Sequence, residues 1–213
     1  MDLVRVYEML LKDFGRQFWW PAETQFEVMV GAILTQQTTW TSVEVAVRNL
    51  KREKLLNPHS LADSSVKLVE TMIRPTGFYK QKAKRIMKLA KYIVDGYGGS
   101  VNRFLKRPKL ELRRKLLSLE GVGFETADVI VLYAADMLMF PIDAYTRRFC
   151  SRFGLGDMDY EALRTYFEEN LPREVQVYKE LHALIDQLGK TYCKKTPDCV
   201  SCSLSRECAR KID

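Results

Sequence analysis

The sequence predicts an all-α protein, and three observations support this prediction. Apolar residues recur at helical spacing along most of the chain, and proline or glycine separates the segments that carry this pattern. Thr24 and Asp143 stand at N-cap positions just before two of these segments. The sequence contains no strand-like alternation of any length, no internal repeat beyond generic helices and no low-complexity tail.

Breaks in the periodic pattern give the order of the elements. The first helix ends at Gly15, and Asn57-Pro58 and Arg107-Pro108 interrupt the pattern further along the chain. A lysine-rich helix follows Tyr79. We expect the remaining helices at residues 3–14, 26–34, 42–52, 64–73, 110–117, 124–135, 144–153, 160–170 and 175–188.

Composition points to a globular protein with a polyanionic partner. The 213 residues include 34 Lys and Arg against 27 Asp and Glu, which gives a net charge of +7. This excess is typical of proteins that bind nucleic acid, although many basic proteins bind none. The N-terminal segment is amphipathic with two acidic residues, and no apolar run approaches membrane-spanning length. We therefore expect a cytoplasmic, nucleoid-associated monomer with no membrane contact.

A tight turn at Gly121-Val122-Gly123 separates two helical patterns. Two glycines at this spacing permit positive φ and leave no side chain over the backbone. The next helix therefore begins with open N–H groups, which suit a phosphate oxygen or a cation bridging to one. A plain helical hairpin would show the same turn.

Four of the five cysteines lie close together near the C-terminus. Their spacing is Cys193-x5-Cys199-x2-Cys202-x5-Cys208, and neither of the two histidines is nearby. Thiolates this close in sequence suit one all-sulfur site, either a zinc ion or an iron–sulfur cluster. Cys150 lies alone in an apolar helix, where we expect a buried thiol.

The stretch LEGVGFETADVIVLYAADMLMFPIDAYTRR at residues 119–148 resembles the helix-hairpin-helix motif and catalytic Asp of the endonuclease III superfamily of DNA glycosylases. The resemblance implies a six-helix domain at about residues 18–137 and a discontinuous domain built from residues 1–17 and 138–213. It also implies a [4Fe–4S] cluster on the four cysteines, although the first interval is one residue shorter than the family pattern, and zinc stays the alternative.

The resemblance identifies Asp143 as the catalytic carboxylate, facing a cleft between the two domains. Bifunctional members of the superfamily carry a lysine at the position of Glu125, and that amine attacks the sugar to form a Schiff base. A carboxylate cannot perform this reaction. The expected enzyme is therefore a monofunctional glycosylase without lyase activity. Glu125 is expected either to line the base pocket or to cap its helix.

Several other residues are expected to contact double-stranded DNA that contains a damaged base. Gln37 matches the position of a glutamine that fills the hole left by a flipped base, and Phe78 or Tyr79 would be the wedge entering the duplex. Lysines on one helix face would contact phosphates, although such a stripe is equally a solvated surface. The stripe consists of Lys80, Lys84, Lys88 and Lys91.

Tryptophans indicate which base is removed. Trp19, Trp20, Pro21 and Trp40 could form a flat, electron-rich slot for a cationic purine rotated out of the stack. Together with the GFYKQKAKRI string and the hairpin without lysine, they make the chain similar to 3-methyladenine DNA glycosylases of the endonuclease III type. Lys190 is a further possible pocket or phosphate contact.

Two other functions stay open at this point. A glycosylase of the same fold could act on mispaired thymine or uracil, or on oxidised pyrimidines, but neutral bases call for hydrogen-bonding groups in the pocket. A non-catalytic helical DNA-binding protein would use Asp143 only as a helix cap.

Overall fold

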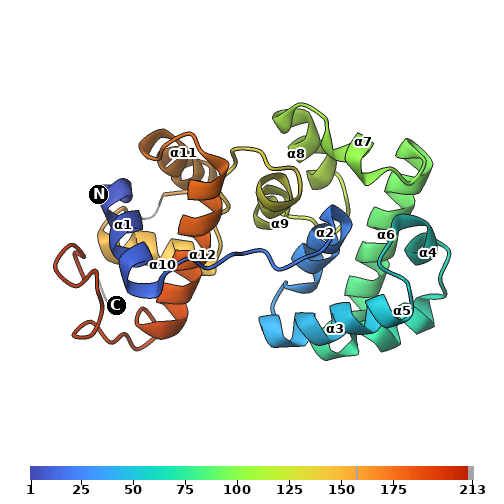
Figure 1. The fold of residues 1–213 in the computed structure, drawn as a ribbon, viewed down its shortest axis with the longest axis horizontal. Coiled ribbons are helices and arrows are strands. Elements are labelled where there is room, and N and C mark those ends of the chain that lie inside the picture. The colour runs from blue at the N-terminus through green and yellow to red at the C-terminus, as the bar shows by residue number, and fades with distance from the viewer. Residues whose placement is uncertain (157, 211–213) are drawn as a thin grey trace. The chain divides into compact units, whose positions relative to one another are not determined.

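The computed structural model describes residues 1–156 and 158–210, and this part of the chain is helical with no β-strand. The all-α prediction is therefore confirmed. The chain forms two compact units (Figure 1). Unit 1 combines Met1–Pro21 with the chain from Met137 onward, and unit 2 is the continuous segment Ala22–Asp136. Residues 18–21 and 137, which we expected in the six-helix domain, thus fall in unit 1.

Unit 2 is built around a buried central helix. Residues 26–34, nearly the whole of α2, are buried, as expected for a helix that is apolar on all sides. Two helices of five residues, α4 and α7, were not predicted. The elements of unit 2 are α2 (Gln25–Leu34), α3 (Trp40–Arg52), α4 (Pro58–Ala62), α5 (Val66–Ile73), η1 (Arg74–Thr76), α6 (Tyr79–Tyr97), α7 (Val101–Leu105), α8 (Lys109–Leu117), α9 (Phe124–Val129) and η2 (Ile130–Ala134).

Capping side chains set the starts of these helices. Thr24 accepts a hydrogen bond from the backbone N–H of Glu27, as predicted for an N-cap. Thr39 caps α3 in the same way, so Trp40 is the first residue of that helix and not part of the preceding turn. The helix predicted at 124–135 is α-helical only to Val129 and continues as the π-helical η2.

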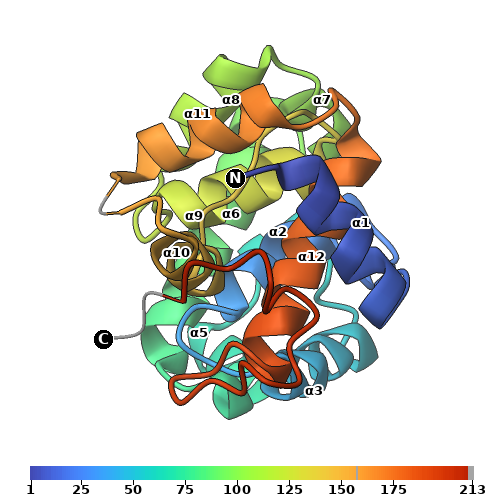
Figure 2. The same ribbon diagram turned by 90° about the vertical axis from the view of Figure 1, so that its left-hand side faces the viewer.

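Unit 1 contains α1 (Leu3–Phe14), α10 (Ala144–Phe153), α11 (Tyr160–Asn170) and α12 (Val175–Thr191). Its core includes Phe140, whose ring stacks on Phe167 at a centroid distance of 4.2 Å and meets Tyr178 edge-on at 5.8 Å. The loop after α12 folds back over the end of that helix (Figure 2). None of the described helices is both long and apolar enough to cross a lipid bilayer.

Candidate active site and cysteine pocket

The predicted site residues divide between the two units. Unit 1 holds Trp19, Trp20, Pro21, Asp143, Lys190 and the four clustered cysteines. Unit 2 holds Gln37, Trp40, Phe78, Tyr79, Lys80, Lys84, the Gly121–Gly123 turn and Glu125.

Asp143 is the N-cap of α10. Its Oδ1 accepts a hydrogen bond of 2.7 Å from the backbone N–H of Thr146, and its side chain is 16% exposed. The loop before it is fixed because Phe140 and Ile142 are fully buried, and because the N–H of Ile142 donates to the Tyr160 hydroxyl. The local pattern of apolar residues followed by an aspartate therefore presents one partly accessible carboxylate.

The second oxygen of Asp143, Oδ2, takes no part in the capping hydrogen bond. His182 Nε2 on α12 is 3.6 Å from Asp143 Oδ2, within ion-pair distance when the imidazole is protonated. The imidazole is buried, and its ring meets Phe140 edge-on at 6.1 Å. His182 was not predicted at the site, because 39 positions separate it from Asp143 and no local pattern joins the two residues.

The three tryptophans are partly exposed. The rings of Trp19 and Trp20 have centroids 5.3 Å apart and are tilted by 54°. Trp40 donates its indole N–H to Glu44 one turn further along α3, at 2.9 Å. Unit 1 contains the indole pair and Asp143, and a common pocket of the three tryptophans with Asp143 stays a prediction.

Lys190 lies at the C-terminal end of α12, where α10 and α12 pack closely. A Cβ at Gly189 would collide with the Tyr145 ring, so glycine is needed for this approach. The Lys190 ammonium lies 5.9 Å from the centre of that ring and pairs with Asp186. The Arg148 guanidinium also lies over the Tyr145 ring, at 5.0 Å.

The hairpin turn connects α8 and α9 in unit 2. Gly121 has a φ of +80°, a conformation that favours glycine, and Val122 is buried while Gly123 is exposed. Glu125 is exposed in the first turn of α9, and the N-cap of that helix makes no side-chain hydrogen bond. The two hairpin helices are joined by a buried ion pair between Arg113 and Asp128.

The other predicted DNA contacts lie on exposed parts of unit 2. Gln37 and Phe78 are both exposed and both have positive φ, of 53° and 44°. Lys80 and Lys84 are exposed on α6, as predicted, whereas two members of the stripe have acidic partners. These are Lys88, which pairs with Glu120, and Lys91, which pairs with Asp95.

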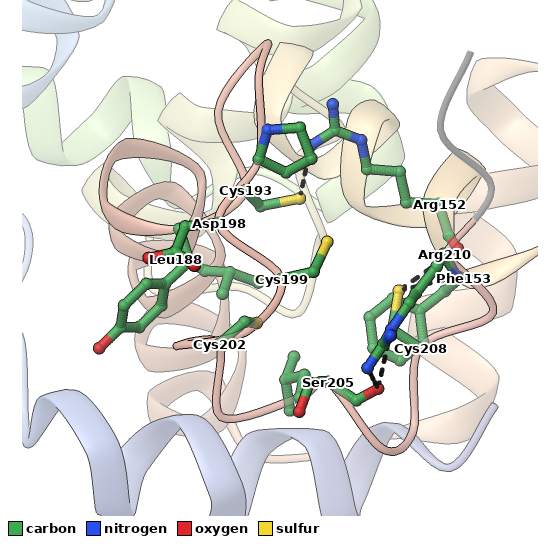
Figure 3. Close-up of a pocket in the computed structure, with 13 residues that line it drawn as sticks. Arg152, Phe153, Leu188, Cys193, Asp198, Cys199, Cys202, Ser205, Cys208 and Arg210 are labelled. Atoms are coloured by element: carbon green, nitrogen blue, oxygen red, sulfur yellow. Dashed lines mark hydrogen bonds between the residues drawn. The ribbon is translucent and has the colours of Figure 1, made fainter.

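The four clustered cysteines line one pocket in unit 1 (Figure 3). Leu188, Leu204 and Phe153 contribute apolar walls. Burial raises the pKa of the Cys202 and Cys208 thiols, so a ligand that binds thiolates there releases protons. Cys150 is fully buried elsewhere, and burial raises the pKa of its thiol to about 12.

Two arginines on α10 hold the cysteine loop. Arg152 Nη1 donates to Cys193 Sγ at 3.1 Å and to the carbonyl of Lys194 at 2.7 Å. Arg148, one turn earlier, donates to the carbonyls of Cys193 and Gly189. Neither arginine was predicted from the sequence, although the available signal was two arginines one turn apart on the helix that Asp143 caps.

Four cysteine thiols form the donor set of this pocket, and such a set suits either a zinc ion or an iron–sulfur cluster. In the described residues no three Cys, His, Asp or Glu side chains converge closely enough to share a single metal ion.

Comparisons with known proteins agree with this architecture. Residues 30–173 match the HhH-GPD superfamily of base excision DNA repair proteins. A candidate DNA repair glycosylase of Methanocaldococcus jannaschii is 45% identical over 213 residues, covering 98% of this chain and 96% of that protein.

Two solved structures show the same fold. The H. pylori 3-methyladenine DNA glycosylase bound to 1,N6-ethenoadenine has a TM-score of 0.79 and 27% identity, covering 89% of this chain and 98% of that one. A trapped covalent endonuclease III–DNA intermediate has a TM-score of 0.82 and 25% identity, covering 99% and 97%. The chain therefore belongs to the HhH-GPD superfamily of base excision DNA repair proteins and is a DNA glycosylase of that superfamily.

Proposed function

We propose that the chain is a monofunctional DNA glycosylase that removes alkylated purines, chiefly 3-methyladenine, from double-stranded DNA by hydrolysis. The observation that carries this proposal is the carboxylate of Asp143, which uses Oδ1 as a helix cap and keeps Oδ2 outside that hydrogen bond. A carboxylate fixed in this way can stabilise an oxocarbenium-like sugar or activate a water.

The indole pair supports the choice of an alkylated base. A purine alkylated at a ring nitrogen is positively charged and is already a good leaving group, so it needs binding more than general-acid help. Trp19 and Trp20 lie in the same unit as Asp143 and are partly exposed. A cation over such rings gains about 2 kcal/mol when water is excluded. Within unit 1 we assign Pro21 and Lys190 to the surroundings of the same pocket, and in unit 2 we propose Trp40 and Glu125 as further contacts of the flipped base.

Glu125 supports the monofunctional part of the proposal. An exposed carboxylate stands in the hairpin where a lyase would need an amine nucleophile. The endonuclease III complex with a similar fold is a trapped covalent intermediate. Hydrolysis by this chain would leave an intact abasic site.

Unit 2 supplies the proposed duplex contacts. The open hairpin turn at Gly121, Val122 and Gly123 would meet a phosphate, and Lys80 and Lys84 would meet others. Exposed Gln37 would occupy the hole left by the flipped base, and exposed Phe78, followed by Tyr79, would enter the stack.

A base-release assay tests the substrate assignment. Duplexes with 3-methyladenine, with a uracil or thymine mispair, and with an oxidised pyrimidine are incubated with wild-type protein and with Asp143→Asn. We expect wild-type protein to release free 3-methyladenine and the variant to lose this activity. Release confined to mispaired or oxidised bases would overturn the substrate assignment. Activity on none of the duplexes would overturn the proposed enzyme and favour a non-catalytic DNA-binding protein.

We also propose that Cys193, Cys199, Cys202 and Cys208 bind a [4Fe–4S] cluster. The four thiols line one pocket, and Arg152 donates a hydrogen bond to the sulfur of Cys193. Such a cluster would act as a structural cross-link of the C-terminal loop, because its irons bond thiolates from both ends of that loop.

Metal analysis of anaerobically purified protein tests this assignment. We expect about four irons per chain, loss of iron in Cys202→Ser and retention in Cys150→Ala, since Cys150 lies outside the pocket. Stoichiometric zinc in the wild-type protein would overturn the cluster assignment while leaving the glycosylase proposal untouched.

A further inference from the structure

Three turns of unit 2 carry the proposed DNA contacts, and they are far apart in the sequence. The first is the α2–α3 turn at residues 35–39, which contains Gln37. The second precedes α6 at residues 74–78 and ends at Phe78, and the third is the hairpin turn at residues 119–123. Their relative positions within unit 2 decide whether all three can meet one duplex at once.

Gln36 joins the α2–α3 turn to the hairpin turn. Its Nε2 donates to the carbonyl of Gly121 at 2.9 Å and to the hydroxyl of Thr126 at 3.0 Å. Its Oε1 accepts a hydrogen bond of 2.7 Å from Nη1 of Arg85 on α6. Both donors and the acceptor of this amide are therefore engaged.

Arg85 also packs directly against the hairpin. A Cβ at Gly121 would collide with the guanidinium, so the first glycine of the turn is needed both for its positive φ and for this contact. Gln36 and Arg85 thus both contact Gly121 and are hydrogen-bonded to each other.

Lys82 joins the other two turns. This side chain is fully buried, and its ammonium donates to the carbonyl of Leu34 at 2.8 Å and to the carbonyl of Thr76 at 2.7 Å. Leu34 ends α2 directly before the first turn, and Thr76 lies within the second. One buried cation therefore fixes the α2–α3 turn against the turn before α6.

Two exposed residues flank these fixed points in left-handed backbone conformations. Gln37 follows Gln36 with a φ of 53°, and Phe78 ends the second turn with a φ of 44°. Non-glycine residues keep such conformations only where their surroundings impose them, and they concentrate at functional sites. Gln37 directly follows Gln36, and Phe78 lies two residues after Thr76, so each stands beside a residue that is held by these hydrogen bonds.

We propose that Gln36 is a positioning residue for DNA binding, which sets the hairpin turn and the Gln37 turn at a fixed separation. Lys82 and Arg85 extend this linkage to α6 and to Phe78. The inference rests on the proposed function, because it takes the three turns to contact DNA. Gln36 itself acts through Gly121 and Gln37 and not by touching the duplex.

The salt dependence of DNA affinity tests this inference with Gln36→Leu. Kd is measured for a duplex with a tetrahydrofuran abasic-site analogue at about 50 to 200 mM salt. If the variant loses one phosphate contact at the hairpin, the slope of log affinity against log salt falls in magnitude by about 0.9. Loss of this one contact corresponds to about fivefold weaker binding at about 0.15 M salt.

Gln25→Leu is the matched control, because Gln25 also donates from its amide to a backbone carbonyl of unit 2, that of Ala134 at 2.9 Å. We expect it to lower the thermal midpoint without changing the slope. If Gln36→Leu shows the same Kd and the same salt slope as the wild-type protein, the positioning role is overturned. The proposed function is unaffected by that result, because the wild-type protein still binds the duplex. Wild-type protein that binds no duplex would instead refute the proposed function.

Gln36→Glu covers the case in which the leucine variant does not fold. It keeps the acceptor for Arg85 but removes both amide donors to Gly121 and Thr126. We expect the same reduced slope, and an unchanged slope would again overturn the inference.

Discussion

Removing the Arg113 guanidinium is expected to destabilise unit 2 strongly. Arg113 Nε donates to Asp128 Oδ1 at 2.6 Å and Nη2 to Oδ2 at 3.2 Å, so the pair is bidentate. Asp128 is fully buried and the Arg113 side chain is 12% exposed. Arg113→Met leaves a buried carboxylate without this cation, which costs about 3–5 kcal/mol of unfolding free energy.

A double-mutant cycle separates this ion pair from simple packing. Arg113→Met combined with Asp128→Leu removes both charges, and an apolar pair of similar volume is expected to recover most of the loss. Urea unfolding followed by circular dichroism measures each variant. Lys91→Met, which breaks an exposed pair with Asp95, is the control and should leave stability nearly unchanged.

Two results would refute this reasoning. One is a loss below about 1 kcal/mol in Arg113→Met, which would place Asp128 in a well-solvated environment. The other is a double variant as unstable as the sum of the two single variants, since independent sites add and a pair does not.

The remaining predictions concern a buried lysine, the hairpin carboxylate and the cysteine loop. Burial, with a smaller effect of Arg85, lowers the pKa of Lys82 from 10.5 to about 8. Between these two pKa values the unfolded chain binds more protons at Lys82 than the folded chain does. The difference in unfolding free energy between wild type and Lys82→Met should therefore rise from pH 8 to 10.5. A difference that does not change with pH would contradict this prediction. Borohydride should trap no DNA–protein adduct with wild type, and efficient trapping would overturn the monofunctional proposal. Arg152→Leu loses its bonds to the cysteine loop and should lose iron to a chelator faster than the exposed control Arg206→Leu; equal rates would contradict the role of Arg152.

Features encoded by neighbouring residues could be predicted from the sequence. Thr24 and Asp143 cap helices because an N-cap side chain bonds to an N–H only three residues away. The cysteine spacing likewise predicts a shared pocket, because short loops keep the four thiols together.

Features that depend on distant contacts could not be predicted. Lys82 reads as one more lysine of a basic helix, but its ammonium is buried against the carbonyl of Leu34, 48 positions away. Asp128 lies in a segment that reads as apolar, and its ion pair with the distant Arg113 could not be read from that segment. The partner of Asp143 on α12, His182, has no local signature either.

The chemistry assigned to Asp143 can be separated from its role as a cap. Asparagine caps helices about as well as aspartate, so Asp143→Asn should change stability by only a few tenths of a kcal/mol. Asp159 caps α11 in the same unit and accepts a hydrogen bond from the N–H of Ala162 at 2.8 Å. Asp159→Asn is therefore a matched control for the loss of a capping carboxylate.

Single-turnover release of 3-methyladenine by these two variants is the decisive measurement. The rate should fall by about 10²–10⁴-fold in Asp143→Asn and stay at the wild-type value in Asp159→Asn. An Asp143→Asn protein that folds and keeps the wild-type rate would contradict the assignment of Asp143 as the catalytic carboxylate.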